Sequence, residues 1–458
     1  MHTRSKLSWS DLAGASVGVW GLGREGHANL RKLLTLGVEP ILVDDAPAGP
    51  VVTQDEARPV LATREDGFAA LTGCEVIVKG PGISRYRPEV AGLERLGIPV
   101  VGGLGLWLQE APVERVVCVT GTKGKSTVVS VAGHLITGLG YRCLVGGNIG
   151  YPPYDPELGA GPWDYWVIEV SSYQATDLAS SPPVVGLTSL HPDHLPWHGG
   201  SVESYFRDKL SVCSQPGADL TVANGDSDLI RDRAGLLGPR VEWVSAGDEP
   251  GATWMEPLGL LGLHNRRNAL IARRCLVALG VPGAADDAAM RAAARGYQSL
   301  PSRLQIIGDV AGVTFVDDSL STNVLPTVAA LDAFDGRRVA LIVGGQDRGI
   351  DYAPLAAALR HRQAPTYVLT LPDNGPRIGA EIEAANREPG GSQGTGGSQD
   401  TDITVTDCPD LDAAVAAGFT WASPDGVVLL SPAAPSFGHF RDYRARGEAF
   451  ARAMQALS

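Results

Sequence analysis

A glycine- and lysine-rich segment, TGTKGKST at residues 120–127, carries the clearest chemistry in the chain. It follows a β-branched run and precedes a helical pattern, so its backbone N–H groups and the N-terminus of the helix can hold a polyphosphate. In such loops the lysine, here Lys125, reaches the β- and γ-phosphate oxygens, and the next hydroxyl, here Ser126, is a magnesium ligand. The spacing differs from that of the ordinary P-loop, because the position five before Gly124 is Val119. The sequence predicts an ATP-binding loop made of Gly121, Thr122, Lys123, Gly124, Lys125, Ser126 and Thr127.

A second glycine-rich loop lies near the amino terminus. GLGREG at 21–26 fits G-x-G-x-x-G and follows a predicted strand at 15–20, and Asp44 belongs to the next predicted strand at 40–45. By itself this arrangement is typical of a dinucleotide site, so an NAD-dependent dehydrogenase is an alternative function. A single fingerprint of this kind is a weak signal, and the remaining motifs have to decide.

Predicted strands alternate with helical stretches in three regions of the chain, which is the pattern of parallel α/β sheets. Near-continuous apolar runs at 165–170, 184–188 and 339–343 indicate strands buried on both faces. A length of 458 residues with 44% apolar residues supports more than one core. We expect an α/β protein of three domains, at 1–112, 113–303 and 304–458. The first and third would be Rossmann-like, and the second would be a P-loop ATPase domain with a mostly parallel sheet.

The loop at 120–127 is similar to the ATP loop of the Mur ligase family, and further segments resemble that family's motifs in the same order. They are VKGPGIS at 78–84, GGNIG at 146–150, EVSSYQ at 169–174, DHLPWH at 193–198, YFRDK at 205–209, HNRRN at 264–268, LPSR at 300–303 and DSLSTN at 318–323. One departure is Pro196, which stands where the family has an aspartate. The resemblance implies an ATP-dependent ligase that forms an acyl phosphate. A non-catalytic nucleotide sensor on the same scaffold is disfavoured, because the residues expected to bind Mg²⁺ and the expected lysines are all present.

The resemblance also implies roles for individual residues. Catalysis would involve Lys125, Glu169, His194 and Lys209, and Mg²⁺ would be held by Ser126, Glu169, His194 and Lys209. Lys209 would be carbamylated, because an unmodified ammonium would repel the metal. Further contacts to ATP would come from Asn265, Asn268, Arg303 and Asp318. The UDP-sugar would be bound by Gly21, Leu22, Gly23, Asp44, Gly82, Asn148 and His194.

The amino-terminal βαβ pattern and the segment SPAAPSF at 431–437 resemble the glutamate-adding, MurD-type branch of the family. That branch would join glutamate to UDP-N-acetylmuramoyl-L-alanine, with Thr322, Arg348, Ser436 and Tyr443 around the amino acid. The pocket departs from the D-glutamate pattern at Leu320, Arg348, Gly438 and Tyr443, where that pattern has Lys, Lys, Asp and Phe. Moving a pocket's cations changes specificity more than fold, so we expect L-glutamate. An ordinary D-glutamate ligase is the alternative.

Bulk properties limit the partners. The formal charge is −13 and no basic run occurs, so nucleic acid and anionic membranes are not expected partners. No signal-peptide core and no long apolar span are present, and we expect a cytoplasmic monomer. The six cysteines are scattered singly, as expected of buried small residues. The repeated GGSQ at 389–400 predicts a mobile loop.

Overall fold

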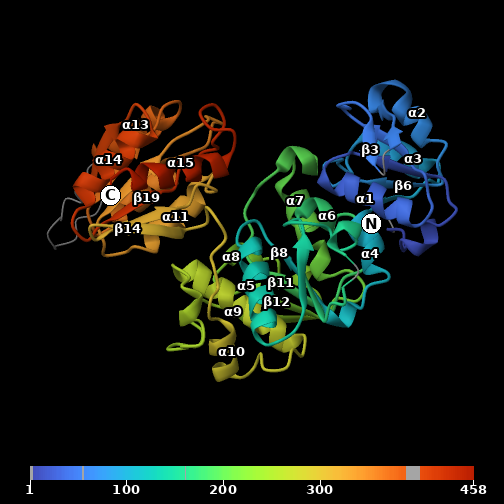
Figure 1. Ribbon diagram of the computed structural model, residues 1–458, viewed down its shortest axis with the longest axis horizontal. Coiled ribbons are helices and arrows are strands. Elements are labelled where there is room, and N and C mark those ends of the chain that lie inside the picture. Colours follow the sequence, from blue (N-terminus) through green and yellow to red (C-terminus); the bar gives the residue numbers. More distant parts are fainter. Residues whose placement is uncertain (1–3, 54–55, 160, 388–402, 458) are drawn as a thin grey trace. The chain divides into compact units, whose positions relative to one another are not determined.

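The computed structural model describes residues 4–53, 56–159, 161–387 and 403–457, and the predicted loop at 389–400 lies outside them. The chain forms two compact units (Figure 1). The first contains Met1–Leu258 and Asn265–Tyr297, and the second contains Gly259–His264 and Gln298–Ser458. Two large sheets belong to the first unit and one to the second.

The first sheet is parallel, in the order β5-β2-β1-β6-β7, and a two-stranded β3-β4 ribbon lies apart from it. Its β1, which the sequence pattern located at 15–20, is buried along its whole length, and so is β6. The elements are β1 (Val17–Trp20), α1 (Arg24–Thr35), β2 (Ile41–Asp44), β3 (Val51–Thr53), β4 (Glu56–Arg58), β5 (Val60–Ala62), α2 (Phe68–Leu71), β6 (Val76–Lys79), α3 (Pro88–Arg95), β7 (Val100–Gly102) and α4 (Gly103–Leu108).

The second sheet is also parallel, in the order β13-β12-β11-β8-β10-β9. Its β8 is flanked by β10 and β11, so the loop that follows β8 lies between the carboxyl ends of both neighbours. In open α/β sheets ligands bind at such an edge. The elements are β8 (Val116–Thr120), α5 (Lys125–Gly138), β9 (Cys143–Gly147), β10 (Tyr165–Glu169), α6 (Ser172–Ala175), β11 (Val184–Leu187), α7 (Val202–Leu210), β12 (Leu220–Asn224), α8 (Asp228–Arg231), β13 (Arg240–Val244), α9 (Leu263–Ala278) and α10 (Asp287–Ala293).

The third sheet has the order β14-β15-β19-β16-β17-β18, and only β14 pairs antiparallel with its neighbour. The predicted α/β class with mostly parallel sheets is confirmed. The elements are β14 (Gln305–Val310), β15 (Val313–Asp317), α11 (Val324–Asp332), β16 (Val339–Val343), α12 (Ala353–His361), β17 (Thr366–Thr370), α13 (Gly375–Arg387), β18 (Ile403–Asp407), α14 (Leu411–Ala422), β19 (Val427–Leu430) and α15 (Tyr443–Gln455).

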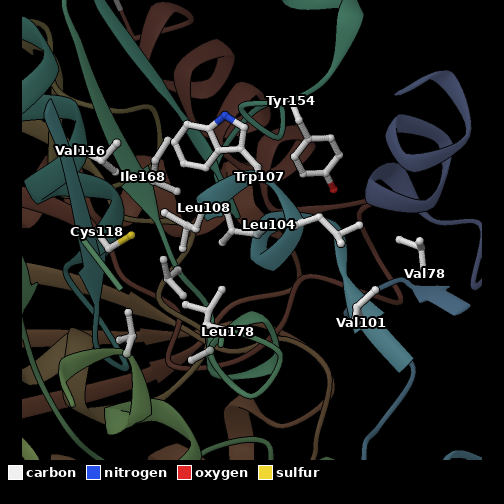
Figure 2. Packing of buried hydrophobic residues seen from close by; sticks show 14 of the residues in the cluster. Val78, Val101, Leu104, Trp107, Leu108, Val116, Cys118, Tyr154, Ile168 and Leu178 are labelled. Carbon is white, nitrogen blue, oxygen red and sulfur yellow. The ribbon is translucent and has the colours of Figure 1, made fainter. Parts of the chain in front are cut away.

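The two sheets of the first unit share one hydrophobic core (Figure 2). Every residue of α4, with the sequence GLGLWL, is buried. Its Leu104 and Trp107 belong to the same cluster as Val78 of the first sheet and Ile168 of the second. Burial of this kind contributes roughly 1.5–3 kcal/mol for each large apolar side chain.

Buried charges accompany this core. Lys79, at the end of β6, donates from Nζ to Asp177 Oδ2 at 2.5 Å, and Arg85 Nε donates to Asp177 Oδ1 at 2.5 Å. Glu25 of α1 is 8% exposed and accepts a hydrogen bond from Gln174 Nε2 at 2.5 Å. Removing one partner from such a set leaves a buried charge or polar group unpaired, which is strongly destabilising.

The cysteines are free thiols. The prediction that they are buried is confirmed for five of them, while Cys143 is partly exposed. No helix in the described part of the chain is long and apolar enough to cross a bilayer.

Burial raises the pKa of the Glu25 carboxyl from 4.5 to about 7, against the opposing charges of Lys79 and Arg24. Because the unfolded chain loses this proton at lower pH than the folded chain, the stability that Glu25 contributes falls as the pH rises from about 4.5 through about 7. Glu25→Gln cannot ionise. The thermal midpoint of the variant minus that of the wild type should therefore increase by a few degrees between about pH 5 and about pH 8.

Thermal unfolding at several pH values measures this difference. The matched control is Glu448→Gln, at an exposed position of α15. A Glu25→Gln difference that stays constant over the whole pH range would contradict the assignment.

Candidate active site at the phosphate loop

The loop between β8 and α5 depends on two glycines with positive φ angles, 140° at Gly121 and 87° at Gly124. A Cβ atom on Gly121 would lie 2.1 Å from Thr188 Oγ1, so only glycine fits. Thr122 Oγ1 donates to the carbonyl of His191 at 3.0 Å. The loop is therefore fixed before any ligand arrives, with the N-terminus of α5 directly after it.

Two lysines donate to one carbonyl oxygen of this loop. Lys125 Nζ lies 2.9 Å from Gly121 O, and Lys209 Nζ lies 3.0 Å from the same atom. Lys209 is 2% exposed. Burial, followed by the charge of Lys125, holds the pKa of the Lys209 ammonium far below its ordinary value. Lys209 thus has access to its neutral amine form, which is the form that reacts with CO₂ to give a carbamate.

Glu169, the last residue of β10, lies beside the loop and is 2% exposed. Its Oε2 accepts from Ser126 Oγ at 2.7 Å, and its Oε1 accepts from Asn148 Nδ2 at 2.7 Å. A carboxylate and a hydroxyl next to a phosphate loop suit Mg²⁺, which prefers oxygen ligands. Ser126 and Glu169 therefore fit the predicted metal.

No group of three or more His, Cys, Asp and Glu side chains that could hold a metal occurs among the residues that the structure describes. A magnesium ion here would thus depend on the Ser126 hydroxyl, the phosphates and a modified Lys209, besides Glu169. His194 has a left-handed backbone, with φ 52°, and its side chain is about half exposed. Burial lowers the pKa of its imidazole, and the negative charge of Asp193 partly opposes this shift. The neutral ring that results is the form that binds metals.

The remaining residues predicted to bind ATP fall into two groups. Asn265 and Asn268 are buried at the start of α9, where Asn268 Nδ2 donates to Asn265 Oδ1 at 3.2 Å. A Cβ atom on Gly124 would lie 3.0 Å from Asn268 Oδ1, so α9 meets the loop. Arg303 and Asp318 belong to the second unit. There Asp318 accepts from Ser431 Oγ at 2.7 Å, and burial raises the pKa of its carboxyl to about 7.

The amino-terminal glycine loop has a clear structural logic. A Cβ atom on Gly26 would lie 2.0 Å from Gly21 O, which explains the final glycine of the motif. Leu22 N donates to Asp44 Oδ2 at 2.6 Å, so Asp44 fastens the loop that contains Gly23. In a dinucleotide site an acidic residue at this position binds a ribose. Here both carboxylate oxygens already accept backbone hydrogen bonds, because Ala46 N donates to Asp44 Oδ1 at 3.0 Å.

Gly82 and Asn148 face this region from other elements. A Cβ atom on Gly82 would meet nothing within 4 Å, so its backbone is open to a ligand. The Gly82 carbonyl accepts from Trp197 Nε1 at 3.2 Å. The Asn148 carbonyl accepts from Arg24 Nη2 at 2.8 Å.

Of the four residues predicted to bind glutamate, Ser436 lines a cavity that Thr322, Arg348 and Tyr443 do not line. Ser436 is 4% exposed and lines a cavity of about 220 Å³. Thr322 and Tyr443 are partly buried, and neither lines that cavity. Arg348 is exposed, its Nε lies 3.2 Å from Gln346 Oε1, and its guanidinium lies over Phe437. The cavity is lined by Gly344, Gly345, Leu371, Pro372, Pro409, Asp410, Leu411, Ser436, His439, Phe440 and Arg446.

Sequence reasoning missed Arg446, a buried cation at this cavity. It is 1% exposed, and its Nη2 donates to Ser319 O at 2.9 Å and Ala434 O at 3.0 Å. Its Nε is buried and has no hydrogen-bond partner among the described residues. Only the proximity of Arg446 to Ser436 along the chain could have drawn attention to it.

Comparison with known proteins identifies the family. The Mur ligase middle domain matches residues 119–258, and the Mur ligase glutamate ligase domain matches residues 302–434. A UDP-N-acetylmuramoyl-L-alanine–L-glutamate ligase of Micromonospora sp. is 39% identical, over 97% of this chain and 98% of its own length. The protein of the same name from Salinispora tropica is 38% identical, over 97% and 98%.

The fold agrees with these matches. The structure of MurF from Thermotoga maritima in complex with ADP is 16% identical with a TM-score of 0.53, over 100% of this chain and 99% of that one. The resemblance inferred from the motifs is confirmed. Full-length similarity to named ligases, with both domain models matched in order, shows that the chain belongs to the Mur ligase family.

Proposed function

We propose that the chain is an ATP-dependent ligase that joins glutamate to UDP-N-acetylmuramoyl-L-alanine in peptidoglycan precursor synthesis. The names of its relatives support this reaction over the dehydrogenase alternative. The observation that carries the proposal is the geometry beside the phosphate loop. There Glu169 accepts from Ser126 at 2.7 Å, while Lys125 and Lys209 donate to Gly121 O at 2.9 and 3.0 Å.

In the first step a carboxylate oxygen of the UDP-linked substrate attacks the γ-phosphorus of ATP. An O–P bond forms, the bond to the β-phosphate oxygen breaks, and its electron pair leaves with ADP. Lys125 positions the phosphoryl oxygens and offsets their negative charge. Mg²⁺, when bound by Ser126, Glu169, His194 and carbamylated Lys209, adds further positive charge beside those oxygens.

In the second step the glutamate amine attacks the acyl carbon of the acyl phosphate. A C–N bond forms, the C–O bond to phosphate breaks, and inorganic phosphate leaves while the amine loses a proton. The chemistry needs no nucleophile from the protein. The rate comes from holding the two reactants together and from fixed charges. Positioning alone can lower the activation barrier by roughly 7–11 kcal/mol.

We place the glutamate site at the cavity that Ser436 lines. Arg446 supplies a buried cation beside it, and Ser436 supplies a hydroxyl, so a carboxylate could be bound there by a charge and a hydrogen bond. Thr322, Arg348 and Tyr443 do not line this cavity, and their contacts with glutamate stay predictions from the motif resemblance. The preference for L-glutamate belongs to the same proposal. So do the predicted contacts with ATP, made by Asn265, Asn268, Arg303 and Asp318. The predicted contacts with the UDP-sugar are made by Gly21, Leu22, Gly23, Asp44, Gly82, Asn148 and His194.

A cytoplasmic monomer with domain boundaries near 112 and 303 is also proposed. The alternation of predicted strands and helices supports the boundaries, and the lack of a long apolar span in the sequence supports the location. Sedimentation of the purified chain tests the monomer directly.

Phosphate release should require ATP, Mg²⁺, the UDP-linked substrate and glutamate together. Leaving out any one should abolish it, since the acyl phosphate forms on one substrate and is consumed by another.

Replacing Lys125 by Ala should lower turnover by about a hundredfold or more, because one preorganised charge is lost. A coupled phosphate assay with product detection by mass measures both effects. Reduction of NAD by a hydroxy acid without ADP formation would refute the ligase.

Lys209→Ala should be slow, and acetate or formate should restore part of its activity. A small carboxylate can occupy the position of the lost carbamate. Lys125→Ala serves as the matched control, because added acetate cannot replace a cation. Equal stimulation of both variants, or stimulation of neither, would count against a carbamate at Lys209.

The enzyme should turn over L-glutamate faster than D-glutamate. Leu320 cannot pair with a carboxylate, and the planar fork of Arg348 binds one differently from a lysine. Turnover with each enantiomer at equal concentration measures the preference. The double variant Leu320→Lys with Arg348→Lys should lose the L preference. A wild-type preference for D-glutamate would refute this part of the proposal.

A further inference from the structure

A chain of buried hydrogen bonds passes through His198, the last residue of the 3-10 turn η5 (Leu195–His198). The imidazole is 0% exposed. Its Nδ1 lies 2.6 Å from Asp208 Oδ2, and its Nε2 lies 3.0 Å from Ser172 Oγ. When Nδ1–H donates to the Asp208 carboxylate, Nε2 of the neutral ring accepts from the Ser172 hydroxyl.

Both partners of His198 lie within three residues of predicted catalytic residues. Ser172 begins α6, three residues after Glu169. Asp208 precedes Lys209 on α7. His198 therefore connects the two segments of backbone that present Glu169 and Lys209 at the phosphate loop.

The same three residue types form the catalytic triads of hydrolases. Here Ser172, His198 and Asp208 are 3%, 0% and 8% exposed, so a substrate has no access to the Ser172 hydroxyl. A hydrolytic site is therefore not the explanation. The arrangement is one that holds backbone segments in place.

The turn that contains His198 is also fastened to the loop around Gly82. Trp197 Nε1 donates to Pro81 O at 3.1 Å and to Gly82 O at 3.2 Å, and Ser84 Oγ donates to Trp197 O at 2.5 Å. Tyr86 OH donates to the same Asp208 Oδ2 that His198 contacts, at 3.0 Å. Residues 81–86 thus meet the His198 network at two points, Trp197 and Asp208.

We propose that His198 is a positioning residue that couples binding of the UDP-linked substrate to the placement of Glu169 and Lys209. The inference rests on the proposed function, since it takes Gly82 as part of the UDP-sugar site. A shift of residues 81–86 on substrate binding reaches His198 through Trp197 and through Asp208. From His198 the shift passes to the segments that present Glu169 and Lys209.

His198→Phe keeps a ring in the buried space but removes both hydrogen bonds. It should lower kcat by about tenfold and raise the Mg²⁺ concentration needed for half-maximal activity by about fivefold or more, within the usual range of coupling between sites. The KM for glutamate should change less than about twofold, because glutamate is proposed to bind in the second unit. Ser172→Ala should change the Mg²⁺ requirement in the same direction. His361→Asn, at an exposed position of α12, is the control and should leave all three values unchanged.

The coupling itself is tested by combining His198→Phe with Tyr86→Phe. Their effects on kcat/KM for the UDP-linked substrate should not multiply, because both act through Asp208. Multiplying effects, or variants that melt earlier but keep the wild-type kcat and Mg²⁺ requirement, would overturn the inference. A wild-type protein that ligates no glutamate would instead refute the proposed function, so the two failures are distinguishable.

Discussion

Two ammonium groups, on Lys125 and Lys209, donate to the single carbonyl oxygen of Gly121. Like charges this close repel one another, and the repulsion grows as water is excluded. The site is therefore organised around a requirement for negative charge. A polyphosphate satisfies it at Lys125, and neutralisation or carbamylation satisfies it at Lys209. The open N-terminus of α5 suits such an anion, and Glu169 with Ser126 suits the Mg²⁺ that would accompany it.

The sheet order makes this convergence possible. Because β8 has β10 on one side and β11 on the other, the strand ends place Thr120, Glu169 and the segment after Leu187 along one edge. Helix α7 then brings Lys209 to this edge from a more distant part of the sequence. No single motif contains the site, and the parallel topology assembles it. The buried residues of α4 extend the same core into the first sheet, so the loop around Gly82 has a fixed platform.

Much of this arrangement could be predicted from the residue pattern. Near-continuous apolar runs located β10, β11 and β16, because a strand covered on both faces needs apolar side chains on both faces. Motif resemblance predicted Ser126 and Glu169 as magnesium ligands, and their side chains lie 2.7 Å apart. The His198 network could not be predicted, because Ser172, His198 and Asp208 are each ordinary in the local sequence. Arg446 was missed for a similar reason, since burial of an arginine depends on carbonyls such as Ser319 O and Ala434 O, whose positions only the fold determines.

The cysteines give the molecule a chemical property of its own. Thiolates, not thiols, react with oxidants and electrophiles. Burial raises the pKa of Cys118, Cys213 and Cys275 well above the ordinary thiol value in the central core, and it raises the pKa of the partly exposed Cys143 to about 12. Each thiol is thus kept protonated by the packing that also hides it. These four thiols are consequently poor nucleophiles in the folded chain, and their reactivity increases when that packing opens.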